Sequence, residues 1–141
     1  MNVLRLSIPP LPRFAAPARR AFLKFARFHR LTALDAENLL LAMGEAIANA
    51  IRHAATDEAI EVQIRIDGGV VVATIRDRGC GFALPAQRQL ALPSVSAEAG
   101  RGITIMQRCT HFLDIRRGPE TGTVVTLGRY RSRHQELAAV S

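Results

Sequence analysis

The sequence feature that most constrains the fold is an almost wholly apolar stretch, Leu40–Ala54, in which polar side chains recur at steps of four. It reads LLAMGEAIANAIRHA, a strong helix pattern that Glu45, Asn49 and His53 interrupt at four-residue steps. Four residues rotate an α-helix by about 40° beyond a full turn, so these groups form one narrow stripe. A helix this apolar is expected to be buried, and a buried carboxylate needs a partner or a chemical role. Taken alone, however, such a stripe more often marks the solvated edge of an amphipathic helix.

The length of the chain and its cysteines limit the class of protein to which it can belong. A chain of 141 residues is most simply one domain, with a core at about residues 5–130 and a tail at 131–141. The sequence shows neither an apolar run long enough for a membrane span nor the apolar segment of a secretory signal. Cys80 and Cys109 lack metal-ligand spacing and are expected to be free thiols in a reducing compartment. We therefore expect a cytoplasmic protein without a membrane partner.

The charge is strongly basic and unevenly distributed. The net charge is +7, and seven cationic residues precede Asp35, the first acid. Such a surface suits a nucleic acid, an acidic protein surface or an anionic ligand. The sequence has no interleaved aromatic pattern, recognition-helix signature or zinc-finger spacing, so direct binding of nucleic acid is not expected. A basic nucleic-acid binder remains the third interpretation.

Periodicity predicts a strand and two helices in the first part of the chain. Residues 2–8 alternate between apolar and polar side chains, which is typical of a strand at a sheet edge. Residues 15–31 predict a helix with phenylalanines toward the core and a cationic outer face. Asp35 is expected to be the N-cap of a second helix, which runs to about His53 and carries the polar stripe.

The second part of the chain is expected to be mainly β. Residues 59–67 and 70–77 alternate around Gly68-Gly69, which predicts a tight β-hairpin. Two final strands are predicted at residues 112–117 and 122–130. Together with the helices, these segments indicate an α/β fold.

Two glycine motifs follow the hairpin. Asp77-x-Gly79-x-Gly81 places a carboxylate at a strand end and lets the backbone approach a ligand closely, although plain turns have the same composition. Residues 83–99 are expected to form an irregular, mobile loop. Gly100-Arg101-Gly102 then leads into a predicted helix, whose N-terminal N–H groups would favour an anion such as phosphate. A flexible hinge explains these glycines equally well, and the spacing matches neither a Walker A loop nor a dinucleotide-binding motif.

In order and context, these three motifs resemble the N, G1 and G2 boxes of the GHKL (Bergerat-fold) ATP-binding superfamily. The forms EAIANAIRHA, DRGCGF and GRGITIM are similar to those of bacterial anti-sigma-factor serine/threonine kinases of the RsbW type. The resemblance implies a two-layer α/β sandwich with a mixed, mainly antiparallel sheet and helices on one face. It covers about residues 5–130.

The resemblance also implies roles for individual residues. Asn49 would hold Mg²⁺, Glu45 would be the general base that activates a serine or threonine hydroxyl, and Asp77 would accept a hydrogen bond from the adenine amino group. The remaining residues implied in ATP binding are Gly79, Gly81, Gly100, Arg101, Gly102, Ile103 and Thr123. For Arg101, a solvated side chain is an equally good interpretation, and His53 is more simply structural.

The function that the resemblance implies is an ATP- and Mg²⁺-dependent kinase that phosphorylates a STAS-type anti-sigma-factor antagonist and sequesters a sigma factor. The resemblance also implies a homodimer. The alternative is an ATP-binding switch module that docks on a partner without physiological kinase turnover. A histidine kinase is not expected, because none of the four histidines lies in a preceding helical-hairpin domain. Glu45 distinguishes the two leading hypotheses, since a pure ATP binder needs the metal ligand but not the base.

Overall fold

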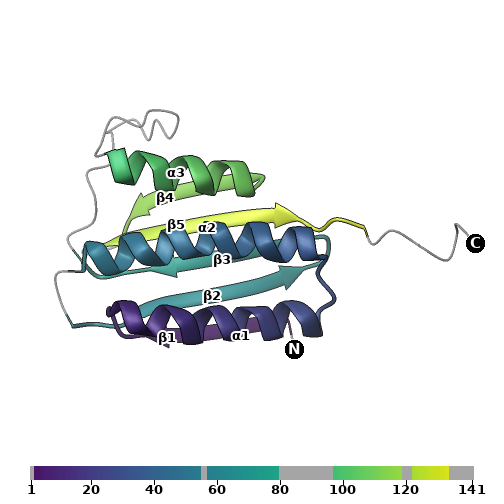
Figure 1. Cartoon of the computed structure of the whole chain (residues 1–141), viewed down its shortest axis with the longest axis horizontal. Helices are drawn as coiled ribbons and strands as arrows, with labels where there is room; N and C mark the ends of the chain where they lie inside the picture. The colour runs from purple at the N-terminus through teal and green to yellow at the C-terminus, as the bar shows by residue number, and fades with distance from the viewer. Residues whose placement is uncertain (1, 55–56, 80–96, 119–121, 134–141) are drawn as a thin grey trace, which may run out of the picture.

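A computed structural model describes residues 2–54, 57–79, 97–118 and 122–133 (Figure 1). The elements in chain order are β1 (Val3–Ile8), the 3-10 helix η1 (Pro12–Phe14), α1 (Ala15–Phe28), α2 (Ala33–Arg52), β2 (Ile60–Asp67), β3 (Val70–Arg76), α3 (Ala97–Cys109), β4 (Phe112–Arg117) and β5 (Thr123–Tyr130). Among these residues, no helix combines the length and the apolar character that crossing a membrane requires.

The five strands form one sheet in the order β1-β2-β3-β5-β4, and the helices form a second layer on one face of it (Figure 1). The central helix α2 packs on β3 and β5, between α1 on one side and α3 on the other. The predicted α/β sandwich is therefore confirmed. Each pairing between the described strands is antiparallel, so this sheet is antiparallel throughout rather than mixed.

The central hairpin follows the predicted alternation. Every second side chain of β2 is buried under the helices, and the intervening ones are exposed or half-buried. Gly68 has a φ of 61°, which a glycine adopts without steric cost, and it closes the turn between β2 and β3. As predicted, β1 lies at one edge of the sheet, where it pairs only with β2 among the described strands.

The helix α1 ends at Phe28 rather than at Leu31. Arg30 adopts the left-handed conformation with a φ of 57°, and the N–H of Leu31 donates to the carbonyl of Ala26. The N–H of Arg30 donates to the carbonyl of Arg27, which completes a Schellman C-cap. An arginine at the position that glycine usually takes hides this helix end from a composition-based prediction.

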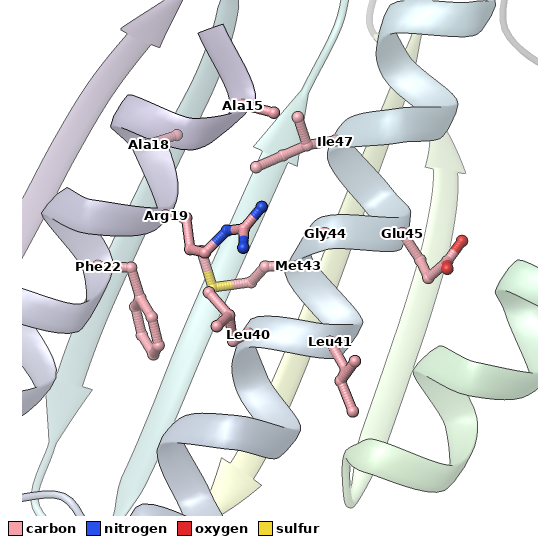
Figure 2. Close-up of a pocket in the computed structure, with 10 residues that line it drawn as sticks. All are labelled: Ala15, Ala18, Arg19, Phe22, Leu40, Leu41, Met43, Gly44, Glu45 and Ile47. Atoms are coloured by element: carbon pink, nitrogen blue, oxygen red, sulfur yellow. The ribbon is translucent and has the colours of Figure 1, made fainter. Parts of the chain in front are cut away.

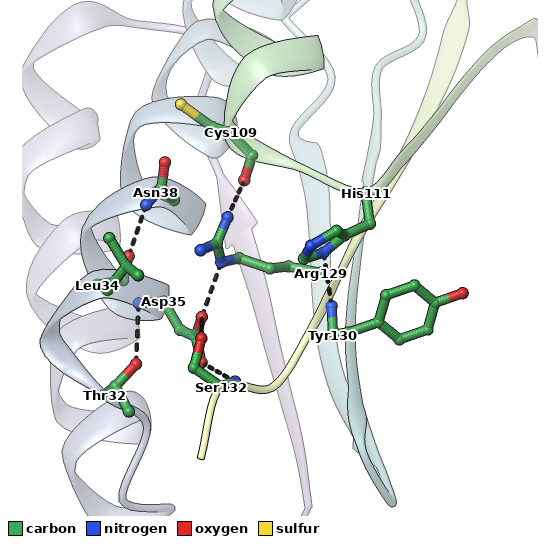
Figure 3. Close-up of polar contacts among 9 residues, drawn as sticks. All are labelled: Thr32, Leu34, Asp35, Asn38, Cys109, His111, Arg129, Tyr130 and Ser132. Atoms are coloured by element: carbon green, nitrogen blue, oxygen red, sulfur yellow. Dashed lines mark hydrogen bonds and ion pairs between the residues drawn. The ribbon is translucent and has the colours of Figure 1, made fainter. Parts of the chain in front are cut away.

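The helix α2 begins one turn before its predicted N-cap, so the capping role expected for Asp35 is wrong. The N-cap is Thr32, whose hydroxyl oxygen accepts a hydrogen bond from the Asp35 N–H at 3.1 Å. The Asp35 carboxylate is therefore not needed as a cap, and it points into the protein (Figure 3).

That carboxylate joins the end of β5 to the start of α2. The Arg129 Nε donates to Asp35 Oδ1 at 2.8 Å, and the N–H and hydroxyl of Ser132 donate to the two carboxylate oxygens (Figure 3). Arg131, the first residue of the predicted tail, donates from its guanidinium to the carbonyl of His29. The chain just after β5 is thus bound to the helical layer.

Candidate functional site

The polar stripe of α2 faces α3 rather than solvent. A Cβ added to Gly102 would lie 3.0 Å from Glu45 Oε2 and 3.5 Å from Asn49 Nδ2. Gly102 is buried and Asn49 is only 2% exposed, whereas Glu45 is half-buried. The structure therefore brings together two of the three motifs, and the absence of a side chain at Gly102 makes room beside the carboxylate and the amide. The stripe is not the solvated edge of an amphipathic helix.

Asn49 has one satisfied and one unsatisfied side-chain atom. Its Oδ1 accepts a hydrogen bond from Arg52 Nη1 at 2.9 Å. Its Nδ2 is buried and has no hydrogen-bond partner among the described residues. Buried polar atoms are usually paired, and the exceptions often lie at functional sites.

Asp77 lies directly after β3 and is buried, being 5% exposed. Its N–H donates to the carbonyl of Thr123, and its Oδ1 accepts the Gly79 N–H at 2.9 Å. Burial raises the pKa of the Asp77 carboxyl above its ordinary value, while the N–H groups of Gly79 and Thr123 and the charge of His53 act in the opposite direction. A desolvated carboxylate of raised proton affinity is a strong acceptor for a ligand N–H group.

Two glycines join this carboxylate to its surroundings. A Cβ at Gly79 would lie 2.2 Å from the carbonyl oxygen of His53, so the Asp77–Gly79 segment rests directly on the C-terminal end of α2. Gly122 has a φ of 84°, and a Cβ there would lie 2.0 Å from the carbonyl oxygen of Asp77. Both positions need glycine for close approach. The Asp77 motif, the start of β5 and the end of α2 therefore meet at one end of the molecule.

The third motif differs from its prediction, because Gly100 and Gly102 do not open a helix. The helix α3 starts at Ala97, since Ala97-Glu98-Ala99 are good helix formers that extend it before the glycines. The N–H groups without an intrahelical acceptor are thus those of residues 97–100, not those that follow Gly102. Ile103 is buried, Arg101 is exposed, and Gly81 lies outside the described residues.

The side chains at this site determine which metal ion it could bind. In the described part of the chain, no group of three or more His, Cys, Asp or Glu side chains is placed to hold a metal ion. An asparagine amide near a half-buried carboxylate would suit Mg²⁺, which keeps several waters and binds phosphate oxygens in nucleotide sites. Asn49 therefore fits a magnesium ion that a phosphate ligand would bring with it.

A separate groove of about 350 Å³ lies between α1 and α2. Figure 2 shows that the Arg19 guanidinium projects between the two helices, whereas the Glu45 carboxylate points away toward α3. Apolar side chains such as Phe22, Leu40 and Met43 form much of its wall. Glu45 thus also borders this groove, although its carboxylate lies on the α3 side of α2, near Gly102.

Sequence reasoning missed two of the contacts just described. Arg52 was not singled out, although its spacing of three residues from Asn49 places the two side chains on one face of a helix. The close contact between Gly79 and the His53 carbonyl joins segments far apart in sequence, and no local pattern indicates it. Only the first of these could have been found from spacing.

Comparison with known proteins identifies the family to which this chain belongs. Residues 8–129 match the histidine kinase-like ATPase domain family. The anti-sigma F factor of Bacillus velezensis is 30% identical over 101 residues, which cover 67% of this chain and 69% of the relative. The anti-sigma F factor of Bacillus subtilis is 29% identical over the same shares of the two chains.

Solved structures show a similar fold. The crystal structure of the RsbU and RsbW domains of Rv1364c from Mycobacterium tuberculosis superposes with a TM-score of 0.74 at 22% identity. The match covers 95% of this chain but 34% of that one, so this chain spans about a third of its length. The SiaB-SiaC complex from Pseudomonas aeruginosa gives a TM-score of 0.63 at 13% identity, covering 89% of this chain and 88% of the other.

Proposed function

The chain belongs to the histidine kinase-like ATPase domain family, and from this premise we propose that it is an ATP-dependent serine/threonine protein kinase that acts as an anti-sigma factor. The observation that carries the kinase assignment is the position of Glu45, one helical turn before Asn49 and beside Gly102. A carboxylate at that point is unnecessary for nucleotide binding alone. It is what a general base needs, because it lies next to the amide that would hold the metal.

In this proposal the buried Asp77 selects adenine. Its carboxylate would accept a hydrogen bond from the adenine amino group, which the raised pKa of the carboxyl favours. Gly79 and Gly81 would let the backbone pass close to the base, and Thr123, which is 1% exposed, would support the pocket from β5. A purine without the amino group should therefore bind more weakly.

The phosphates would lie between α2 and the beginning of α3. The helix N-terminus and the Arg101 side chain would attract the phosphate charge, and Gly100 and Gly102 would allow close approach. Because α3 begins at Ala97, a contact from the N–H groups of Gly102 and Ile103 requires the first turn of α3 to unwind. We infer that this turn rearranges when ATP binds.

Asn49 would hold Mg²⁺ through its side-chain oxygen, and the ion would neutralise charge on the phosphates. Glu45 would take the proton from a serine or threonine hydroxyl of the protein substrate as that oxygen attacks the terminal phosphorus. The bond from this phosphorus to the bridging oxygen of ADP would break, and ADP would leave. The half-buried position of Glu45 leaves one side of its carboxylate accessible to such a hydroxyl. Positioning and charge neutralisation then account for most of the catalysis.

The proposed partners are a STAS-type antagonist as phosphoacceptor and a sigma factor that the protein sequesters. The name of the relatives, anti-sigma F factor, supports this choice. A sigma-factor partner implies a location in the cytoplasm. We propose a homodimer as the working assembly, and light scattering at micromolar concentration tests it, with a monomer as the contrary result.

Replacing Glu45 with glutamine tests the assignment, because the amide keeps the shape and removes the base. Transfer of label from γ-labelled ATP to a purified STAS-type antagonist should fall by about 10²- to 10⁴-fold. ATP affinity should stay within about twofold, since no binding contact is lost. Asn49→Ala is the matched control, which should lose the Mg²⁺-dependent part of ATP binding.

The outcomes separate the kinase from a switch module. If Glu45→Gln transfers phosphate as fast as the wild type, the base is misassigned. If the wild type binds ATP and its partner without labelling it, the protein is a nucleotide-dependent docking module. Salt-dependent binding to DNA or RNA would point instead to a nucleic-acid binder.

A further inference from the structure

The contact between Arg52 and Asn49 fixes the orientation of a buried amide. Arg52 is an exposed residue in the last turn of α2, and its Nη1 lies 2.9 Å from Asn49 Oδ1. A guanidinium has only donors, so the atom that it contacts must be the amide oxygen. The amide nitrogen is consequently turned the other way, toward Gly102 of α3.

That nitrogen is the unsatisfied atom at this end of α2. Asn49 is 2% exposed, and no described group accepts a hydrogen bond from its Nδ2. A Cβ at Gly102 would lie 3.5 Å from this nitrogen, so the unpaired donor faces the space that the glycine leaves open. A buried unpaired donor is costly, and rotating the amide by half a turn would place Oδ1 there instead.

The same oxygen cannot serve Arg52 and a magnesium ion equally well. Mg²⁺ binds oxygen at about 2.0–2.1 Å. A guanidinium that donates to that oxygen would then stand within a few ångströms of the ion, and the two positive charges repel each other. Binding of the metal and the contact with Arg52 therefore oppose each other.

We propose that the Arg52 guanidinium competes with Mg²⁺ for Asn49 Oδ1, so that the metal binds only when Arg52 has left this oxygen. The inference rests on the proposed function, because the metal is the one that would accompany ATP. Arg52 is thus a positioning residue that lowers the affinity for Mg²⁺ by holding the amide in the orientation seen here. Its exposed side chain has room to move into water once it is released.

The test measures ATP binding by calorimetry in excess Mg²⁺ and in EDTA. The ratio of the two affinities reports the contribution of the metal, independently of kinase activity. Arg52→Met removes the charge and the donor but keeps an unbranched side chain with good helix propensity. We expect this ratio to rise by roughly 3- to 10-fold, since the contact is charge-assisted but the arginine is exposed to solvent.

Two further variants make the result specific. Arg108→Met removes the same charge from an exposed position in the last turn of α3, and its ratio should equal that of the wild type. Arg52→Gln should shift the ratio in the same direction as Arg52→Met, which keeps the test valid if one variant folds poorly. In an Asn49→Ala background, Arg52→Met should have no effect.

An unchanged ratio in both Arg52 variants overturns the inference. A lower ratio also overturns it, because Arg52 would then assist the metal or the phosphates. If the wild type shows no ATP binding, or if Mg²⁺ and Asn49→Ala leave ATP binding unaffected, the proposed function itself fails. These results differ from those that contradict only the role of Arg52.

Discussion

Two buried aspartates lie near opposite ends of α2, and their carboxylates have different kinds of hydrogen-bond partner. Asp35, at the N-terminal end, is 1% exposed and is bound by Arg129 and Ser132. Asp77, which lies near the C-terminal end, is 5% exposed, and its carboxylate accepts hydrogen bonds from the backbone N–H groups of Gly79 and Thr123. The first carboxylate has a cationic partner within the fold, whereas the second is held by backbone donors.

The pKa shifts of the two carboxyls follow from this difference. Burial by itself would raise the pKa of Asp35, but the hydrogen bonds from Ser132 and Arg129 outweigh it and hold the pKa below the ordinary value. At Asp77 burial dominates, and the pKa is raised. The comparison teaches that one end of α2 is built for stability, while the other keeps an acceptor whose charge is incompletely compensated, as binding sites often do.

The largest effect on stability is expected at the N-terminal end of α2, where Asp35 lies. Arg129→Met leaves the Asp35 carboxylate buried without its cation and should cost about 3 kcal/mol, because an unpaired buried charge is strongly unfavourable. In thermal unfolding, this corresponds to a decrease of roughly 10 °C in Tm. ATP affinity should not change, since Arg129 lies far from Asp77 along β5.

Arg116→Met is the matched control for that variant. The ion pair of Arg116 with Asp114 is exposed, with 68% and 36% of the two side chains accessible, so its loss should cost less than about 1 kcal/mol. Equal losses of Tm in the two variants would show that the Asp35 pair is no more stabilising than a surface contact.

A smaller loss is expected where the Asp77 segment rests on α2. In Gly79→Ala the new methyl group meets the carbonyl oxygen of His53, so the segment must move, at a cost of about 1–3 kcal/mol. The displacement should also weaken ATP binding, which a stability effect at Asp35 would not do. Denaturant unfolding and calorimetry measure the two effects.

The control is Gly69→Ala in the hairpin turn. A Cβ there meets nothing within 4 Å, and unfolding should change by less than about 0.5 kcal/mol. If Gly79→Ala were as stable as Gly69→Ala and bound ATP normally, the close contact at the end of α2 would be unimportant.

The smallest effect is in the pH dependence of stability, and it has opposite signs for the two aspartates. The folded pKa of Asp35 is lowered from 3.8, so its contribution is present above that pH and is lost as the pH falls through the folded pKa. The folded pKa of Asp77 is raised from 3.8, so its contribution is present below that pH and is lost as the pH rises through the folded pKa.

Unfolding of the wild type, Asp35→Asn and Asp77→Asn from about pH 2 to pH 7 measures these slopes. The stability of the wild type relative to Asp35→Asn should increase with pH, and its stability relative to Asp77→Asn should decrease. Slopes of the same sign would mean that the two carboxyls do not differ in the way that their hydrogen bonds indicate.

Much of the fold was predictable because it depends on local patterns. The alternation in β2 and β3, the Gly68-Gly69 turn and the apolar face of α2 each follow from periodicity over a few residues. The ends of helices were less predictable. Arg30 takes a conformation usually given to glycine, and Thr32 rather than Asp35 caps α2.

The site was predictable as a set of motifs, but not as a set of contacts. The resemblance to the GHKL superfamily implied that Glu45, Asn49 and the glycine motifs belong together, and the structure places Gly102 against both side chains. The predicted start of α3 was wrong. The helix begins before Gly100, because the strong helix formers there outweigh the tendency of glycine to end a helix. The role of Gly81 stays a prediction, since this residue lies outside the described ranges.

The sequence by itself determined the α/β class, the antiparallel hairpin and the polar stripe on α2, because each depends on side-chain spacing within one element. Only the tertiary structure decided which buried carboxylate is paired with a cation and which is held by backbone donors. Asp35 meets an arginine 94 residues away, and Asp77 meets backbone N–H groups instead. The charge and pKa of a buried carboxyl depend on the partners that folding brings to it, and no local pattern contains them.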